Sequence, residues 1–95
     1  GRSGIYPPGS IVKRNSEESG VVIESNPKHS LLPKVMIIRD SLQQIIDPKM
    51  VDLAEKVKIP GSNEFYKITG MLRPNETDIN LVDLRDRGFL LSELH

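Results

Sequence analysis

Three segments predict the β core of this chain: IYPPGSIV (residues 5–12), GVVIESNP (20–27) and LPKVMII (32–38). Two prolines and a glycine predict an entry turn at 7–9, because proline fixes φ and glycine frees the residue after it. The β-branched runs at 11–14 and 20–25 predict a hairpin across the polar connection 15–19. The continuous apolar run at 35–38 predicts a third strand that is buried on both faces.

Two details of these strands carry further expectations. Gly20, at the base of the hairpin, is expected to adopt a positive φ or to mark a bulge. Alternate residues of a strand point to the same side of a sheet. This rule predicts one common core that contains Val21, Ile23, Val35 and Ile37.

The second half of the chain is less regular. Residues 42–46 and 50–53 predict a fourth strand interrupted at Asp47-Pro48, since a proline suits a bulge or an edge strand. The apolar spacing over 42–58 also fits a helix, but Pro48 would cost about 3 kcal/mol inside one, so a strand is favoured.

A loop is expected at 59–63, followed by another short strand at 66–72. Asn75 or Thr77 is expected to cap a helix that ends near Gly88. The apolar segment 89–95 is expected to pack back onto the barrel or onto a partner domain.

The length of 95 residues predicts a single domain, 1–95, able to bury roughly two-thirds of its unfolded surface. Within it we expect a β core at 9–58, then a last strand and a C-terminal extension at 59–95. The expected fold class is mainly β: a small antiparallel SH3-like barrel or strongly curved sheet with a short C-terminal helical extension. Because the chain opens on GRSG and not on Met, we expect it to be excised from a longer protein.

Charge and composition narrow the function. Thirteen basic and thirteen acidic side chains cancel, which removes the simplest electrostatic argument for binding nucleic acid or an anionic membrane. The absence of cysteine excludes disulfides and thiol chemistry, and it is compatible with the cytoplasmic location that we expect. No apolar run approaches the roughly 18 residues of a membrane span.

Residues equipped for chemistry are scarce. His29 lies in a turn and His95 ends the chain, and neither has a second ligand or partner at a useful spacing. The adjacent Glu17 and Glu18 are expected to be exposed turn charges, and Arg85 with Arg87 a solvated helix face. No glycine-rich phosphate loop is present. We therefore expect no catalytic, cofactor-binding or metal-binding residue and no enzymatic activity in this segment.

One alternative comes from the basic residues of the first half, which are Lys13, Arg14, Lys28, Lys34 and Arg39. The strand, turn and GVVI pattern resembles small KOW/Tudor-like barrels, some of which contact RNA. Proteins that bind RNA in this way interleave basic side chains with exposed aromatic ones. Tyr6 is the only aromatic residue in the first half of the sequence. We favour the interpretation that these residues are ordinary charges on exposed strand positions. No specific binding of nucleic acid is therefore expected, unless one face beside Tyr6 is formed by Lys13, Arg14, Lys34 and Arg39.

Four motifs follow one another along the chain: Y-P-x-G-[ST]-x-V, G-V-V-x-E-x-N-P, L-x-P-x-V and V-D-L. In this order they resemble the C-terminal accessory domain that follows the catalytic domain in bacterial HD-GYP cyclic di-GMP phosphodiesterases. The resemblance covers roughly residues 4–54 and continues weakly to about residue 85. The residues that carry it are Tyr6, Pro7, Gly9, Ser10, Val12, Gly20, Val21, Val22, Asn26, Pro27, Leu32, Pro33, Val35, Val51, Asp52 and Leu53.

The resemblance implies a neighbouring helical, metal-dependent domain that hydrolyses cyclic di-GMP. Ile5-Tyr6-Pro7 echoes the Gly-Tyr-Pro motif of that domain but lacks its glycine and its flanking histidines. Pro8 and the hairpin connection also depart from the family pattern. The implied function is a non-catalytic accessory or docking domain in bacterial signalling, with a catalytic domain of the same parent chain or another protein as its partner. The alternative is a small KOW/Tudor-like barrel that binds nucleic acid.

Overall fold

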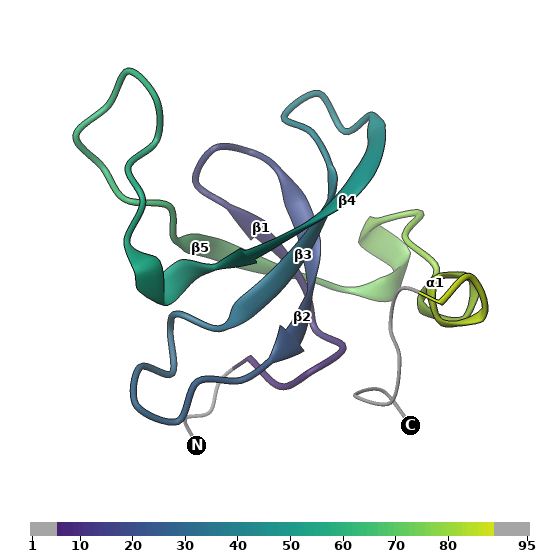
Figure 1. The fold of residues 1–95 in the computed structure, drawn as a ribbon. Coiled ribbons are helices and arrows are strands. Elements are labelled where there is room, and N and C mark those ends of the chain that lie inside the picture. The colour runs from purple at the N-terminus through teal and green to yellow at the C-terminus, as the bar shows by residue number, and fades with distance from the viewer. Residues whose placement is uncertain (1–5, 89–95) are drawn as a thin grey trace.

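The computed structural model describes residues 6–88 and has a mainly β architecture (Figure 1). One antiparallel sheet holds five strands in the order β4-β3-β2-β1-β5. The strands are β1 (Ile11–Arg14), β2 (Ser19–Glu24), β3 (Lys34–Arg39), β4 (Ile45–Asp52) and β5 (Ile68–Leu72). Two 3-10 helices, η1 (Leu53–Glu55) and η2 (Pro74–Glu76), and one short helix, α1 (Leu81–Asp86), complete the described part.

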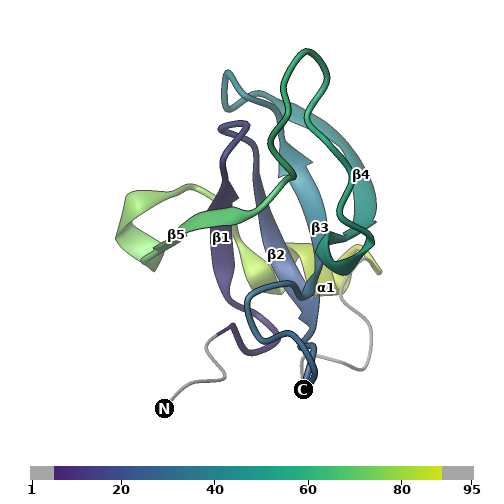
Figure 2. The ribbon, with the colours of Figure 1, turned by 90° about the vertical axis from the view of Figure 1, so that its left-hand side faces the viewer.

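The sheet is open. Its edges are β4 and β5, which do not pair with each other, so the described residues do not close a barrel. The strands twist strongly across the sheet, and the 56–66 connection projects away from it (Figures 1 and 2). β5 comes from the C-terminal half yet pairs with β1, so this part of the predicted C-terminal extension belongs to the same sheet as the predicted β core.

β4 confirms the strand that was favoured over a helix. It runs through Pro48 without a break, and it lies at the sheet edge, where a missing amide hydrogen is tolerated. The interruption expected at Asp47-Pro48 is a register shift, because Ile37 pairs with Lys49 whereas Arg39 pairs with Ile45. The polar turn before β4 contains Leu42, so the strand begins three residues later than predicted.

The predicted single core is wrong, because the sheet has a hydrophobic cluster on each face. The first cluster contains Val21 with Ile23 packed against it, whereas the second contains Val35 and Ile37. The reason is the register: Val21 lies opposite Met36 and Val22 lies opposite Val35, and cross-strand partners share a face. Both faces are therefore buried around β2 and β3, as the apolar run of β3 predicted.

The expected positive φ at Gly20 is absent, because its φ lies outside the left-handed region. Glycine is required here because of a close approach between strands. A Cβ at this position would collide with the Met36 carbonyl oxygen and lie 2.9 Å from Val35 Cγ1. The bulge expected here is present, as the β2–β3 register shifts between Ser19 and Gly20. Glu17 takes the positive φ of this hairpin, at 72°.

The helix cap was assigned to the wrong residues. Asn80 caps α1, and its side-chain oxygen accepts a hydrogen bond from Asp83 N at 3.0 Å. Asn75 instead lies in η2, which Pro74 starts. Ile79 and Leu84 then pack onto the first hydrophobic cluster. Gly88, with φ 87°, follows the helix as expected, and the 89–95 segment lies outside the described residues.

Candidate functional site

The outer edge of β4 is the first part of the candidate site. Leu53 N donates to Pro33 O at 3.3 Å, and bonded pairs alternate along an antiparallel ladder. Val51 and Lys49 therefore direct their backbone groups toward β3, opposite Val35 and Ile37. Met50 and Asp52 fall between these positions and direct their amide and carbonyl groups outward. Within residues 6–88 no strand pairs with this side of β4.

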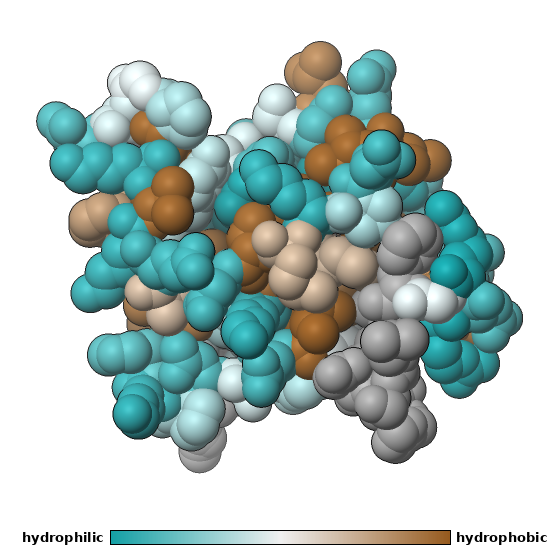
Figure 3. Space-filling model, in the orientation of Figure 1, coloured by the Kyte–Doolittle hydropathy of each residue, from teal (hydrophilic) through white to brown (hydrophobic). Residues whose placement is uncertain are grey.

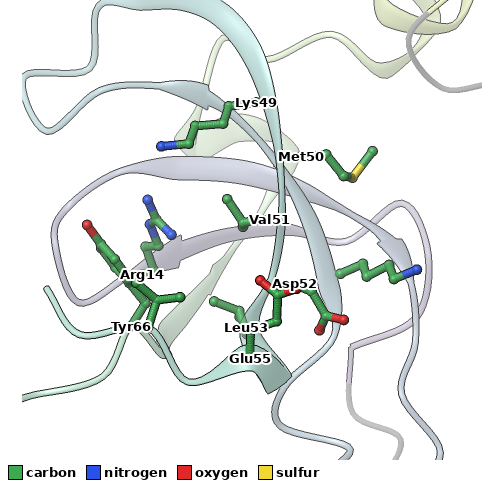
Figure 4. Close-up of a pocket in the computed structure, with 10 residues that line it drawn as sticks. Arg14, Lys49, Met50, Val51, Asp52, Leu53, Glu55 and Tyr66 are labelled. Atoms are coloured by element: carbon green, nitrogen blue, oxygen red, sulfur yellow. The ribbon is translucent and has the colours of Figure 1, made fainter.

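A pocket of about 420 Å³ adjoins this edge (Figure 4). It lies on the side where the sheet stays open: one wall comes from β4 and η1, and the opposite wall from Arg14 and Tyr66. Val51 and Leu53 supply the apolar surface of the first wall and point toward Arg14 and Tyr66, as Figure 4 shows. This volume lies within the range of ligand-binding pockets, about 300–1,000 Å³.

The Arg14 wall is held in place by several contacts. The Arg14 side chain is buried, and its Nε donates to Glu18 Oε1 at 2.7 Å. Its guanidinium lies 3.8 Å from the centroid of the Tyr66 ring, a cation–π contact. Ser16 Oγ also donates to Glu18, at 2.6 Å. A buried cation that is both paired and stacked shapes the pocket, and Glu18 is a partner of this cation where the sequence suggested a solvated charge.

Charges of both signs surround the pocket. Asp52 accepts from Ala54 N at 3.0 Å and caps η1, and Glu55 lies beside it. Lys49 forms no ion pair with any other described residue. Lys34 pairs with Glu24 at 3.2 Å, and the hydrogen bond and negative charge of Glu24 raise the pKa of Lys34. The rim of this pocket can therefore form ion pairs with both acidic and basic side chains of a partner protein.

Exposed apolar side chains occur on several elements of the described part of the chain. They include Met50 and Val57 at the pocket, and elsewhere Leu31, Leu42, Ile45, Phe65, Met71 and Val82. Figure 3 shows apolar residues gathered near the centre and at the upper right of the face drawn there, with polar residues between the two groups. The pocket beside β4 joins apolar contact surface to an open backbone edge.

The four basic residues that define the nucleic-acid alternative are each paired with a carboxylate. The pairs are Lys13–Glu17 at 3.2 Å, Arg14–Glu18 at 2.5 Å, Lys34–Glu24 at 3.2 Å and Arg39–Asp78 at 2.7 Å. The Tyr6 side chain packs against the second hydrophobic cluster. Paired cations and a packed tyrosine do not provide the stacking surface that barrels binding single-stranded nucleic acid use.

The remaining sequence candidates do not come together. His29 is exposed in the 26–30 turn, Arg85 pairs with Asp86 at 3.6 Å, and Arg87 pairs with Asp83 at 3.3 Å. His95 lies outside the described residues. Residues 6–88 contain no group of three metal-ligating side chains. The same part of the chain has no helix that is both long and apolar enough to span a membrane.

Comparison with known proteins gives no relative. Neither the protein-family models, nor the curated proteins, nor the solved structures contain a match to this chain.

The sequence missed the pocket because its walls meet only in the fold. Arg14 and Tyr66 are brought together by the β1–β5 pairing, whose closest signal in the sequence is the short strand expected at 66–72.

Proposed function

We propose that this chain is a non-catalytic, SH3-like docking domain that holds an extended segment of a partner protein along the outer edge of β4. The partner is the catalytic domain of a bacterial HD-GYP cyclic di-GMP phosphodiesterase, in the same parent chain or in another protein, and the complex acts in the cytoplasm. The domain adds no chemistry of its own and positions the catalytic domain.

The observation that carries this proposal is the combination of an unpaired edge with an adjoining pocket. The outward backbone groups of Met50 and Asp52 offer a partner strand its hydrogen bonds. Alternate side chains of such a strand would enter the pocket and contact Val51 and Leu53. Pro48 has no amide hydrogen, so this pairing is short and stops before it.

The choice of partner rests on the sequence resemblance. Its V-D-L motif is Val51-Asp52-Leu53, which supplies both the pocket surface and part of the open edge. Its other residues belong to turns and cores, for instance Asn26, which caps the turn that leads to β3. The resemblance supports the domain context, and the edge of β4 supports the mode of contact.

Two variants at one position test the proposal. Met50→Pro removes an amide hydrogen that points away from the sheet, so the ladder with β3 keeps its bonds, and an edge strand tolerates proline. Met50→Val retains the amide and serves as the matched control. Binding to an HD-GYP catalytic domain from the same genome is measured by calorimetry.

We expect micromolar binding that Met50→Val retains and that Met50→Pro weakens about tenfold or more. Absence of binding at about 100 µM would refute the choice of partner, and equal binding by both variants would refute the edge contact. The nucleic-acid alternative would be favoured by submicromolar binding to oligonucleotides with a steep salt dependence.

A further inference from the structure

A second pocket, of about 540 Å³, has a charge pattern that sets it apart. It lies between Tyr6, the connection from β2 to β3, and the residues that begin β5. Lys28 and Lys67 line it, together with His29, and no carboxylate does. By contrast, the pocket beside β4 and two further pockets, one lined by Asp78 and Asp83 and one by Glu24 and Asp52, each include two carboxylates on their lining.

The two lysines keep their charge free for a ligand. The ion pairs within residues 6–88 use Lys13, Arg14, Lys34, Arg39, Arg85 and Arg87, and neither Lys28 nor Lys67 belongs to any of them. In a chain whose basic and acidic side chains cancel, this pocket is a local excess of positive charge. Such an excess attracts an anion and is screened by salt.

The backbone holds both lysines in place. Asn26 Oδ1 accepts from Lys28 N at 3.0 Å and from His29 N at 3.1 Å, so the turn that carries Lys28 is fixed. Lys67 N donates to Asn15 Oδ1 at 3.0 Å, and Asn15 N donates back to Lys67 O at 2.8 Å. Only the two side chains need ordering when a ligand binds, which lowers the entropy cost of binding.

The rest of the lining offers hydroxyl groups and apolar surface. Ser30 and Tyr6 carry hydroxyl donors, and Leu32 and Ile68 are half-buried side chains of the second hydrophobic cluster. Two ammonium groups with nearby hydroxyls suit the several acceptor oxygens of a phosphate group. The apolar residues suit an aromatic or aliphatic group joined to that phosphate.

We propose that this pocket binds a small organic phosphate, a phosphate monoester whose organic part is aromatic or apolar. Lys28 and Lys67 contact the phosphate oxygens, and the organic part lies against Leu32 and Ile68. The site does not depend on the docking contact at β4, because the two pockets share no lining residue.

Phenyl phosphate is the probe, titrated into the full chain while amide chemical shifts are followed by NMR. Phenol and inorganic phosphate are titrated separately, since each carries one half of the proposed ligand. We expect phenyl phosphate to shift amides of the 28–32 turn and of Lys67, with a Kd near 1 mM or below, and each half to bind about tenfold more weakly.

Variants Lys28→Gln and Lys67→Gln are each expected to weaken phenyl phosphate several-fold. Lys49→Gln, which removes an unpaired charge at the other pocket, is the matched control and is expected to have no effect. All three lysines are exposed, so the core is untouched. Equal binding of inorganic phosphate and phenyl phosphate, or unchanged affinity in both pocket variants, would overturn the proposal. Tighter binding of a glutamate-rich peptide would also overturn it, because the pocket would then belong to a protein partner.

Discussion

Replacing Gly20 with alanine tests the packing of the sheet most sharply. The added methyl group would overlap the Met36 carbonyl oxygen and lie 2.9 Å from both Met36 C and Val35 Cγ1. Two of these three atoms belong to the backbone of β3, so relief requires the strands to separate. Overpacking of this kind costs about 1–3 kcal/mol.

A smaller effect acts in the opposite direction. Alanine restricts the unfolded chain more than glycine does, which stabilises a protein by roughly 0.4–1 kcal/mol where the native backbone suits both residues. Because the overlap is with a backbone atom, we expect a cost in the upper part of this range, about 2–3 kcal/mol, so that Gly20→Ala lowers the free energy of unfolding by about 1–2.5 kcal/mol after subtraction of this gain. For a domain of this size, that change lowers the Tm by roughly 5–15 °C.

Gly70→Ala is the matched control. Gly70 lies in β5, and an added Cβ there has no neighbour within 4 Å. Its φ also lies outside the positive region. The variant should leave the free energy of unfolding unchanged or raise it by up to about 1 kcal/mol. Urea denaturation followed by circular dichroism measures both variants. The close approach of β2 to β3 would be refuted if Gly20→Ala were as stable as the wild type, or if both variants lost the same stability.

Three further outcomes follow from the fold. Val35→Ala should cost about 1–3 kcal/mol of unfolding free energy, because Val35 is buried, and a change within about 0.5 kcal/mol in urea denaturation would contradict its place in the second cluster. Asn80→Ala should cost about 0.5–2 kcal/mol by removing the cap of α1, whereas Asn75→Ala should cost little; equal losses would show that the cap is misplaced. The ion pair of Lys34 with Glu24 raises the pKa of Lys34, so the stability that this pair contributes is complete below the ordinary pKa of 10.5 and is lost as the pH rises through the folded-state pKa. In thermal melts across alkaline pH, the Tm of Lys34→Met should therefore fall less than the Tm of the wild type, and parallel falls would rule the pair out.

The strands could be predicted because their signals are local. β-branched runs, separated by turn residues, place β1, β2 and β3 within a residue or so of their observed bounds. Pro48 likewise indicates an edge strand, because only an edge lacks a ladder bond at that position.

The distribution of the core could not be predicted, because it depends on pairing. Val21 pairs with Met36 in β3, one residue away from Val35, so Val35 and Ile37 lie on the face opposite Val21. The residue that caps α1 was also predicted wrongly. Pro74 starts a separate 3-10 helix, and the predicted cap Asn75 lies inside that helix.

The two pockets lay beyond sequence reasoning because each is built from distant segments. Arg14 meets Tyr66 across the first pocket, and Lys28 joins Lys67 at the second. The sequence singled out Arg14 and Lys28 only as members of a basic group. It could not distinguish the cation that is buried against Glu18 from the one that stays unpaired.

Hydrogen exchange at the edge of β4 reports directly on whether a partner strand pairs with it. The amides of Met50 and Asp52 point away from β3, so in the free chain they should exchange quickly, whereas those of Lys49 and Val51 should be protected. Addition of the HD-GYP catalytic domain should slow exchange at Met50 and Asp52. Unchanged exchange at both amides in a formed complex would contradict docking along β4.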